Sequence, residues 1–152
     1  MKEALRYTQE TTYSCGAASL LIAYHMLGID YNEPTLMHEV GTTPDQGTQM
    51  EVMFNHAASL GFPVELKCNA SYRDLKKDHK RGAVVIAMNP YWNGEPGGHY
   101  VVLEDLDDEI VSLADPGLTK ENWPNMMSKD EFISKWNCPG YPASYLLIRP
   151  KS

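Results

Sequence analysis

The segment that most constrains the fold is residues 15–27, because its apolar side chains cover almost the whole circumference of a helix. A helix that is hydrophobic all round is buried inside a protein. Ser14 is the expected N-cap of this helix and Gly28 its expected end. A chain of 152 residues can bury such a helix in one core without disulfides or metals. We therefore predict a single domain, residues 1–152, built around a central helix.

The rest of the chain predicts helices first and strands later, an order typical of an α+β domain. Helical spacing and cap residues indicate further helices at residues 32–40, 48–60, 71–80 and 128–136. Short apolar or alternating runs indicate strands at residues 63–68, 83–88, 99–104, 110–113 and 144–148. The continuous apolar run at residues 83–88 fits a central strand. Residues 144–148 are expected, by elimination, to close an edge of an antiparallel sheet.

Charge and cysteine content argue against several classes of function. The net charge of −7 disfavours a nucleic-acid partner or an anionic membrane surface, since both require basic patches. No apolar run follows the charged first residues, so no secretory signal is predicted, and residues 17–27 are too few for membrane insertion. Neither a metal nor a cofactor is predicted, because the histidines and cysteines lack ligand spacing. The cysteines suit a reducing cytoplasm and include no CxxC pair: Cys15, Cys68 and Cys138.

Three residues at the ends of predicted elements have the chemistry of a thiol nucleophile site. Cys15 opens the buried helix, where unpaired N–H groups and the helix dipole stabilise a thiolate. His99 starts an apolar strand and can act on the thiol as a base, then donate its proton to a leaving group. Asp115 follows the next strand and can orient the imidazole. Taken alone, a helical cysteine is more often a buried hydrophobe, and an aspartate before Pro116 is a common turn residue.

Gln9 lies six residues before Cys15, on the chain that enters the helix. Its side-chain amide can donate to an oxyanion together with the backbone N–H of Cys15. The loop at residues 89–98 leads into His99 and is a candidate wall of a substrate cleft. Aromatic residues that could line this cleft are Tyr91, Trp92 and Trp123. Helical spacing instead predicts a core position for the stripe of Met50, Met53 and Phe54.

Three motifs of this chain resemble those of the bacteriocin-processing, double-glycine-leader peptidases, which form peptidase family C39. They are Gln-x5-Cys-Gly-x-Ala-x-Leu at residues 9–20, His-Tyr-Val-Val at 99–102 and Ala-Asp-Pro at 114–116. The resemblance implies a papain-like cysteine peptidase fold, with N-terminal helices packed on an antiparallel sheet. It also implies a role for each residue. Gln9 supplies the oxyanion hole, Cys15 attacks, His99 is base and then acid, and Asp115 orients His99.

The resemblance implies a cysteine peptidase that cleaves a peptide or isopeptide bond of a peptide or protein substrate through a Cys15 thioester, without a cofactor. Gly97 and Gly98 beside His99 leave room for small residues, such as Gly-Gly, before the scissile bond. Many family members are domains of peptide-exporting ABC transporters, whereas this sequence predicts a stand-alone member. Two alternatives stay open. One is an amidase or deamidase with the same site, and the other is a non-catalytic peptide-binding module on this fold.

Overall fold

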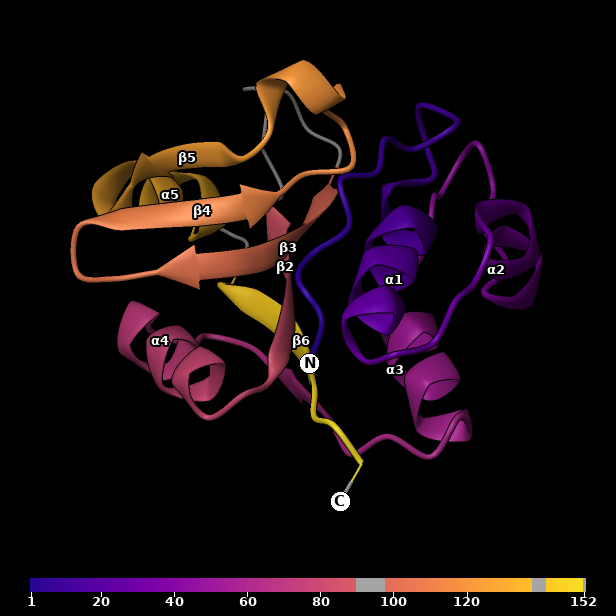
Figure 1. Cartoon of the computed structure of the whole chain (residues 1–152), viewed down its shortest axis with the longest axis horizontal. Helices are drawn as coiled ribbons and strands as arrows, with labels where there is room; N and C mark the ends of the chain where they lie inside the picture. Colours follow the sequence, from indigo (N-terminus) through magenta and orange to yellow (C-terminus); the bar gives the residue numbers. More distant parts are fainter. Residues whose placement is uncertain (90–97, 138–141, 152) are drawn as a thin grey trace.

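A central sheet is covered by helices on both faces in the computed structural model, which describes residues 1–89, 98–137 and 142–151 (Figure 1). One side of the sheet carries α1 (Cys15–Met26), α2 (Glu33–Glu39) and α3 (Met50–Ser59). The other side carries α4 (Tyr72–Lys80) and α5 (Lys129–Trp136). No helix in these residue ranges is long and apolar enough to cross a membrane.

The sheet formed by the described residues has six strands in the order β1-β6-β2-β3-β4-β5, and each neighbouring pair is antiparallel. The strands are β1 (Val64–Lys67), β2 (Val84–Asn89), β3 (His99–Leu106), β4 (Ile110–Ala114), β5 (Asn125–Ser128) and β6 (Ser144–Ile148). A 3-10 helix, η1 (Lys120–Asn122), precedes β5. The α+β class and the antiparallel sheet predicted from the sequence are therefore confirmed.

Alternating side chains of the central strands divide the interior into two cores, because successive residues of a strand point to opposite faces. Val84 and Ile86 of β2 belong to the core that contains α1. Val85 and Ala87 belong to the opposite core, which contains Phe132 of α5. Both faces of β2 are thus covered, which explains why its sequence is apolar without alternation.

The predicted central helix forms, and every α1 residue except His25 is buried. It ends before Gly28, whose φ of +89° is the left-handed conformation that glycine adopts readily after a helix. Ser14 occupies the N-cap position, but its side chain makes no cap hydrogen bond. Its hydroxyl donates instead to the carboxylate of Glu33, at 2.7 Å. The other four predicted helices also form, with ends within two residues of the expected positions.

Two features of the sheet differ from the sequence prediction. The expected edge position of residues 144–148 is wrong, because β6 lies between β1 and β2. Tyr145 and the residues after it in β6 are fully buried, since helices cover both faces of this strand. The second difference is β5, an edge strand that was not predicted. Its sequence, Asn-Met-Met-Ser, has neither an alternating pattern nor β-branched residues; pairing with β4 defines it.

Candidate active site

Helix α1, whose first residue is Cys15, packs against β3, the strand that begins with His99 (Figure 1). Antiparallel register pairs Val102 of β3 with Ala114 of β4, so the chain that leaves β4 returns toward the start of β3. Asp115 is the first residue after β4 and therefore reaches His99. Three elements that are distant in sequence thus bring Cys15, His99 and Asp115 together.

His99 and Asp115 form a direct hydrogen bond, with 2.6 Å between Nε2 and Oδ1. The Asp115 carboxylate is 1% exposed. It also accepts the backbone N–H of Gly117, at 2.8 Å, and the side-chain amide of Asn125, at 3.4 Å. A Cβ added at Gly117 would lie 3.1 Å from Cε1 of His99 and 3.2 Å from Oδ1 of Asp115. The absence of a side chain at Gly117 therefore allows the imidazole and the carboxylate to meet.

The surroundings of His99 raise its pKa and favour the protonated imidazole. Burial by itself lowers the pKa of His99, because it disfavours the charged ring. Hydrogen bonds to Asp115 and to Cys15, together with the charges of both residues, outweigh burial and raise the pKa to about 9. Since Nε2 is bonded to Asp115, Nδ1 is the ring nitrogen left for Cys15. The arrangement places an imidazole with a raised pKa, held by a buried carboxylate, next to the Cys15 side chain.

Gln9 lies beside the same loop but has no described hydrogen bond to Cys15 or His99. Its backbone N–H donates to the carbonyl oxygen of Pro116, at 2.8 Å. Its side-chain nitrogen donates to the carbonyl oxygen of Thr11, at 2.7 Å. An amide nitrogen carries two N–H bonds, and one of them holds the side chain to Thr11; Gln9 is not among the residues that line the cleft at Cys15. The structure therefore places Gln9 next to the Asp115 loop, on the segment that leads to Cys15.

Cys15 opens onto a cleft of about 510 Å³. Residues 44–50 make up much of its lining, to which Met88 and Gly98 also belong. Thr48 packs tightly on the first turn of α1, because a Cβ added at Gly16 would lie only 2.6 Å from its Cβ. The glycine directly after Cys15 thus allows the wall to approach the helix N-terminus.

Several residues at the cleft differ from the sequence predictions. Met50 lines the cleft as well as packing against the core, whereas Met53 is fully buried as predicted. Trp123 packs in the core beside α1 and is not among the residues that line this cleft. Some predictions lie outside the described residues: those for residues 90–97, which include Tyr91 and Trp92, and the one for Cys138.

Cys68 does not line this cleft; it is exposed and has a free thiol.

Two residues of the site were not identified from the sequence. Tyr100 donates its hydroxyl to the carbonyl oxygen of Thr48, at 2.8 Å, and so ties β3 to the cleft wall. Burial and the nearby Cys15 raise the pKa of Tyr100 well above its usual value, which keeps this hydrogen-bond donor protonated. Asn125, the second residue, supports Asp115 from β5. From the sequence, Tyr100 was only a residue of the apolar strand that begins at His99, and no local signal marks Asn125.

The described residues contain no group of three or more His, Cys, Asp or Glu side chains that could hold a metal ion.

The fold is shared with two solved peptidase domains of low sequence identity. The peptidase domain of Streptococcus ComA, a bifunctional ABC transporter involved in quorum sensing, is 22% identical and superposes with a TM-score of 0.76. That similarity covers 95% of this chain and 97% of the ComA domain. A double glycine motif protease from an AMS/PCAT transporter, solved in complex with the leader peptide, is 18% identical with a TM-score of 0.75. That similarity covers 98% of this chain and 93% of the double glycine motif protease.

The sequence itself assigns the family. The model of the Peptidase C39 family matches residues 6–143, and the chain belongs to this family. An uncharacterized protein of Methanothermobacter thermautotrophicus is 33% identical over 113 residues, which cover 72% of this chain and 70% of that protein. The family and the papain-like fold predicted from the three motifs are therefore confirmed.

Proposed function

We propose that this protein is a cysteine peptidase whose nucleophile is Cys15, with His99 as acid and base and Asp115 as the residue that orients His99. The observation that carries the proposal is the hydrogen-bonded series from Cys15 through His99 to Asp115 at the N-terminus of α1. A buried carboxylate is costly unless hydrogen bonds compensate it. Its use here to hold a protonated imidazole beside a thiol fits nucleophilic catalysis better than a purely structural role.

In the proposed mechanism the Cys15 thiolate attacks the carbonyl carbon of the scissile bond, and the carbonyl oxygen becomes an oxyanion. The backbone N–H of Cys15 and the second side-chain N–H of Gln9 donate to that oxyanion. The C–N bond then breaks, the leaving amine takes the proton of His99, and a thioester remains on Cys15. Water next loses a proton to His99 and attacks the thioester. The C–S bond breaks, which releases the carboxylic acid and restores the thiolate and the imidazolium.

We propose peptides or proteins with small residues, such as Gly-Gly, before the scissile bond as substrates. Two observations support this class. Cys15 lines a cleft together with residues 44–50 and Met88, and Gly98 in the same lining has no side chain to obstruct a substrate backbone. A relative in fold is a double glycine motif protease that was solved with its leader peptide. The low number of cysteines favours a reducing, cytoplasmic setting for the reaction.

A peptide panel tests the proposal. Each peptide carries one scissile bond preceded by Gly-Gly, Ala-Ala or Phe-Phe, and fragments are identified by mass spectrometry for the wild type and for Cys15→Ala. We expect cleavage after Gly-Gly by the wild type, and none by the variant. Equal cleavage after Phe-Phe would contradict the preference for small residues. Ammonia release without chain scission would indicate a deamidase, and a Cys15→Ala variant that still cleaves would refute the assigned nucleophile.

A further inference from the structure

Glu33 is a buried carboxylate whose partners all belong to the segment before the nucleophile. It is the first residue of α2 and is 1% exposed. No basic side chain of the described residues forms an ion pair with it. Its oxygens accept the hydroxyl of Tyr7 at 2.8 Å, the backbone N–H of Glu10 at 2.9 Å and the hydroxyl of Ser14 at 2.7 Å. Burial of a carboxylate is costly and is tolerated where several donors converge on it.

Two of the donors to Glu33 are sequence neighbours of the two residues that would form the oxyanion hole. The Glu10 N–H belongs to the peptide unit that joins Glu10 to Gln9. Ser14 directly precedes Cys15, whose backbone N–H is the other donor in the proposed function. One side chain therefore holds residues 9–15 at both ends.

A second series of hydrogen bonds links Glu33 to the Gln9 amide itself. The Ser14 hydroxyl, which donates to Glu33, accepts the backbone N–H of Thr11 at 3.2 Å and the Thr11 hydroxyl at 2.7 Å. The Thr11 carbonyl oxygen in turn accepts the side-chain N–H of Gln9, at 2.7 Å. This explains why Ser14 occupies the N-cap position without capping α1. Its hydroxyl is engaged in connecting Glu33 to Thr11.

We propose that Glu33 is a positioning residue that fixes the oxyanion hole, by holding the Gln9 amide and the Cys15 backbone in one geometry. This inference rests on the proposed function for its effect on turnover. Removal of the carboxylate would leave the donors of Tyr7, Glu10 and Ser14 without their partner and release residues 9–15. Loss of one oxyanion donor commonly lowers turnover by about 10²–10³-fold.

The Glu33→Gln variant removes the negative charge of Glu33 but can keep its hydrogen bonds, so it tells which of the two positions residues 9–15. One glutamine oxygen can replace the oxygen that accepts both the Glu10 N–H and the Ser14 hydroxyl. The glutamine NH₂ would then face the Tyr7 oxygen, which can accept a hydrogen bond. We therefore expect Glu33→Gln to retain most of the turnover that Glu33→Ala loses.

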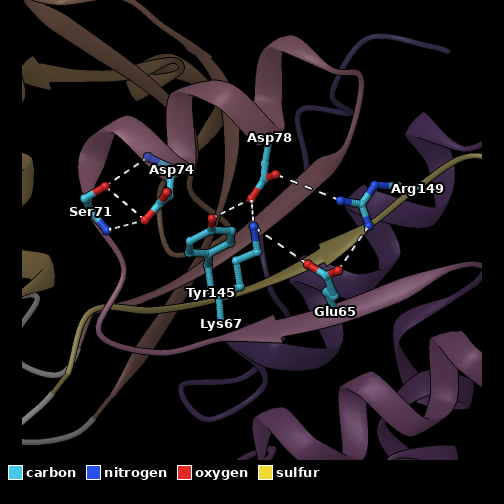
Figure 2. Close-up of polar contacts among 7 residues, drawn as sticks. All are labelled: Glu65, Lys67, Ser71, Asp74, Asp78, Tyr145 and Arg149. Atoms are coloured by element: carbon cyan, nitrogen blue, oxygen red, sulfur yellow. Dashed lines mark hydrogen bonds and ion pairs between the residues drawn. The ribbon is translucent and has the colours of Figure 1, made fainter.

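Asp78 offers a matched control, because it is another buried carboxylate (Figure 2). It belongs to α4, which lies on the opposite side of the sheet from α1 and α2. It is 3% exposed and accepts Lys67 Nζ at 2.7 Å and the Tyr145 hydroxyl at 2.6 Å. Figure 2 shows that these partners come from β1 and β6 and that Arg149 approaches the same carboxylate. Asp78→Ala likewise removes a buried carboxylate that accepts several polar contacts, but that carboxylate makes none with residues 9–15.

The experiment compares the wild type, Glu33→Ala, Glu33→Gln and Asp78→Ala by peptide turnover and by NMR of the Gln9 side-chain amide. We expect Glu33→Ala to lower kcat by about 10²–10³-fold with little change in KM, and to shift the Gln9 amide signals. Asp78→Ala should change neither kcat nor those signals, although it destabilises the fold. A Glu33→Ala variant with unmoved Gln9 signals, or with no greater loss of kcat than Asp78→Ala, would overturn the inference.

Two further outcomes are distinguishable. If Glu33→Ala does not fold, Ser14→Ala replaces it, because this variant cuts the link between Glu33 and Thr11 while keeping the carboxylate. Its Gln9 signals must then move if the inference holds. If the wild type cleaves no peptide, the proposed function fails, while the Gln9 amide signals still decide whether Glu33 positions this segment.

Discussion

Replacement of Asp115 by asparagine tests whether the Asp115 carboxylate raises the pKa of His99. Asp115→Asn keeps the size of the side chain but removes the charge that lies 2.6 Å from Nε2 of His99. The pKa of His99 is about 9, compared with 6.5 ordinarily, although burial acts in the opposite direction. This difference favours the imidazolium by about 3 kcal/mol, at roughly 1.4 kcal/mol per pH unit. A nearby opposite charge commonly moves a pKa by about 1–3 pH units, so His99 in the variant should titrate between about pH 6 and 8.

The assay is an NMR titration of the His99 ring protons, assigned by their loss in His99→Gln. The wild type should show a midpoint near pH 9, and the Asp115→Asn midpoint should be lower. Peptide turnover near neutral pH should fall by about 10²–10⁴-fold, the usual contribution of a positioned acid and base. An unchanged midpoint in Asp115→Asn would refute the reasoning, because the carboxylate could then not be the cause of the raised pKa.

Three further predictions follow from the site and its supports. The rate of peptide hydrolysis should decline as pH rises through about 9, because His99 must be protonated to donate a proton to the leaving amine and its raised pKa keeps it protonated below that pH. A decline centred near pH 6.5 would contradict this. Gly16→Ala should lower the free energy of unfolding in urea by about 1–3 kcal/mol, because the new Cβ would lie 2.6 Å from Thr48 Cβ. Tyr145→Phe should cost about 1.5–3 kcal/mol of stability, because it removes a hydrogen bond to the buried Asp78, and should leave Cys15 alkylation unchanged.

The matched control for Gly16→Ala is Gly98→Ala. A Cβ added at Gly98 would meet the terminal methyl of Met88, at 2.5 Å, which is the far end of a flexible side chain and can turn away. Gly98→Ala should therefore destabilise the protein less than Gly16→Ala. Equal losses from the two variants would show that the close approach of Thr48 to α1 is not the source of the cost.

The parts of the fold that local sequence signals define were predicted well. A helix that is apolar all round and ends before a glycine can only be buried, so α1 was placed correctly. The position of β6 depends instead on which strands it pairs with, and an apolar five-residue run carries no information about its neighbours. β5 lacks even that run, because pairing with β4 rather than residue preference defines it.

In the site, too, residues with a local sequence signal were predicted and residues placed by distant contacts were not. Cys15 and His99 lie at recognisable starts of elements, and the structure brings them together with Asp115. Glu33 has no such signal, because an acidic residue in the first turn of a short helix is ordinarily explained by the helix dipole. Only the three-dimensional structure shows that this carboxylate faces inward, toward the segment that carries Gln9.

The central claim, a thiolate–imidazolium pair at Cys15 and His99, is tested most directly by alkylation of the native protein with iodoacetamide. The rate at each cysteine is followed by peptide mass from about pH 4 to about pH 9, with the exposed Cys68 as an internal reference. We predict that Cys15 reacts fast well below pH 8 and that His99→Ala abolishes this reactivity. A Cys15 that reacts no faster than Cys68, or that is indifferent to His99→Ala, would contradict the account.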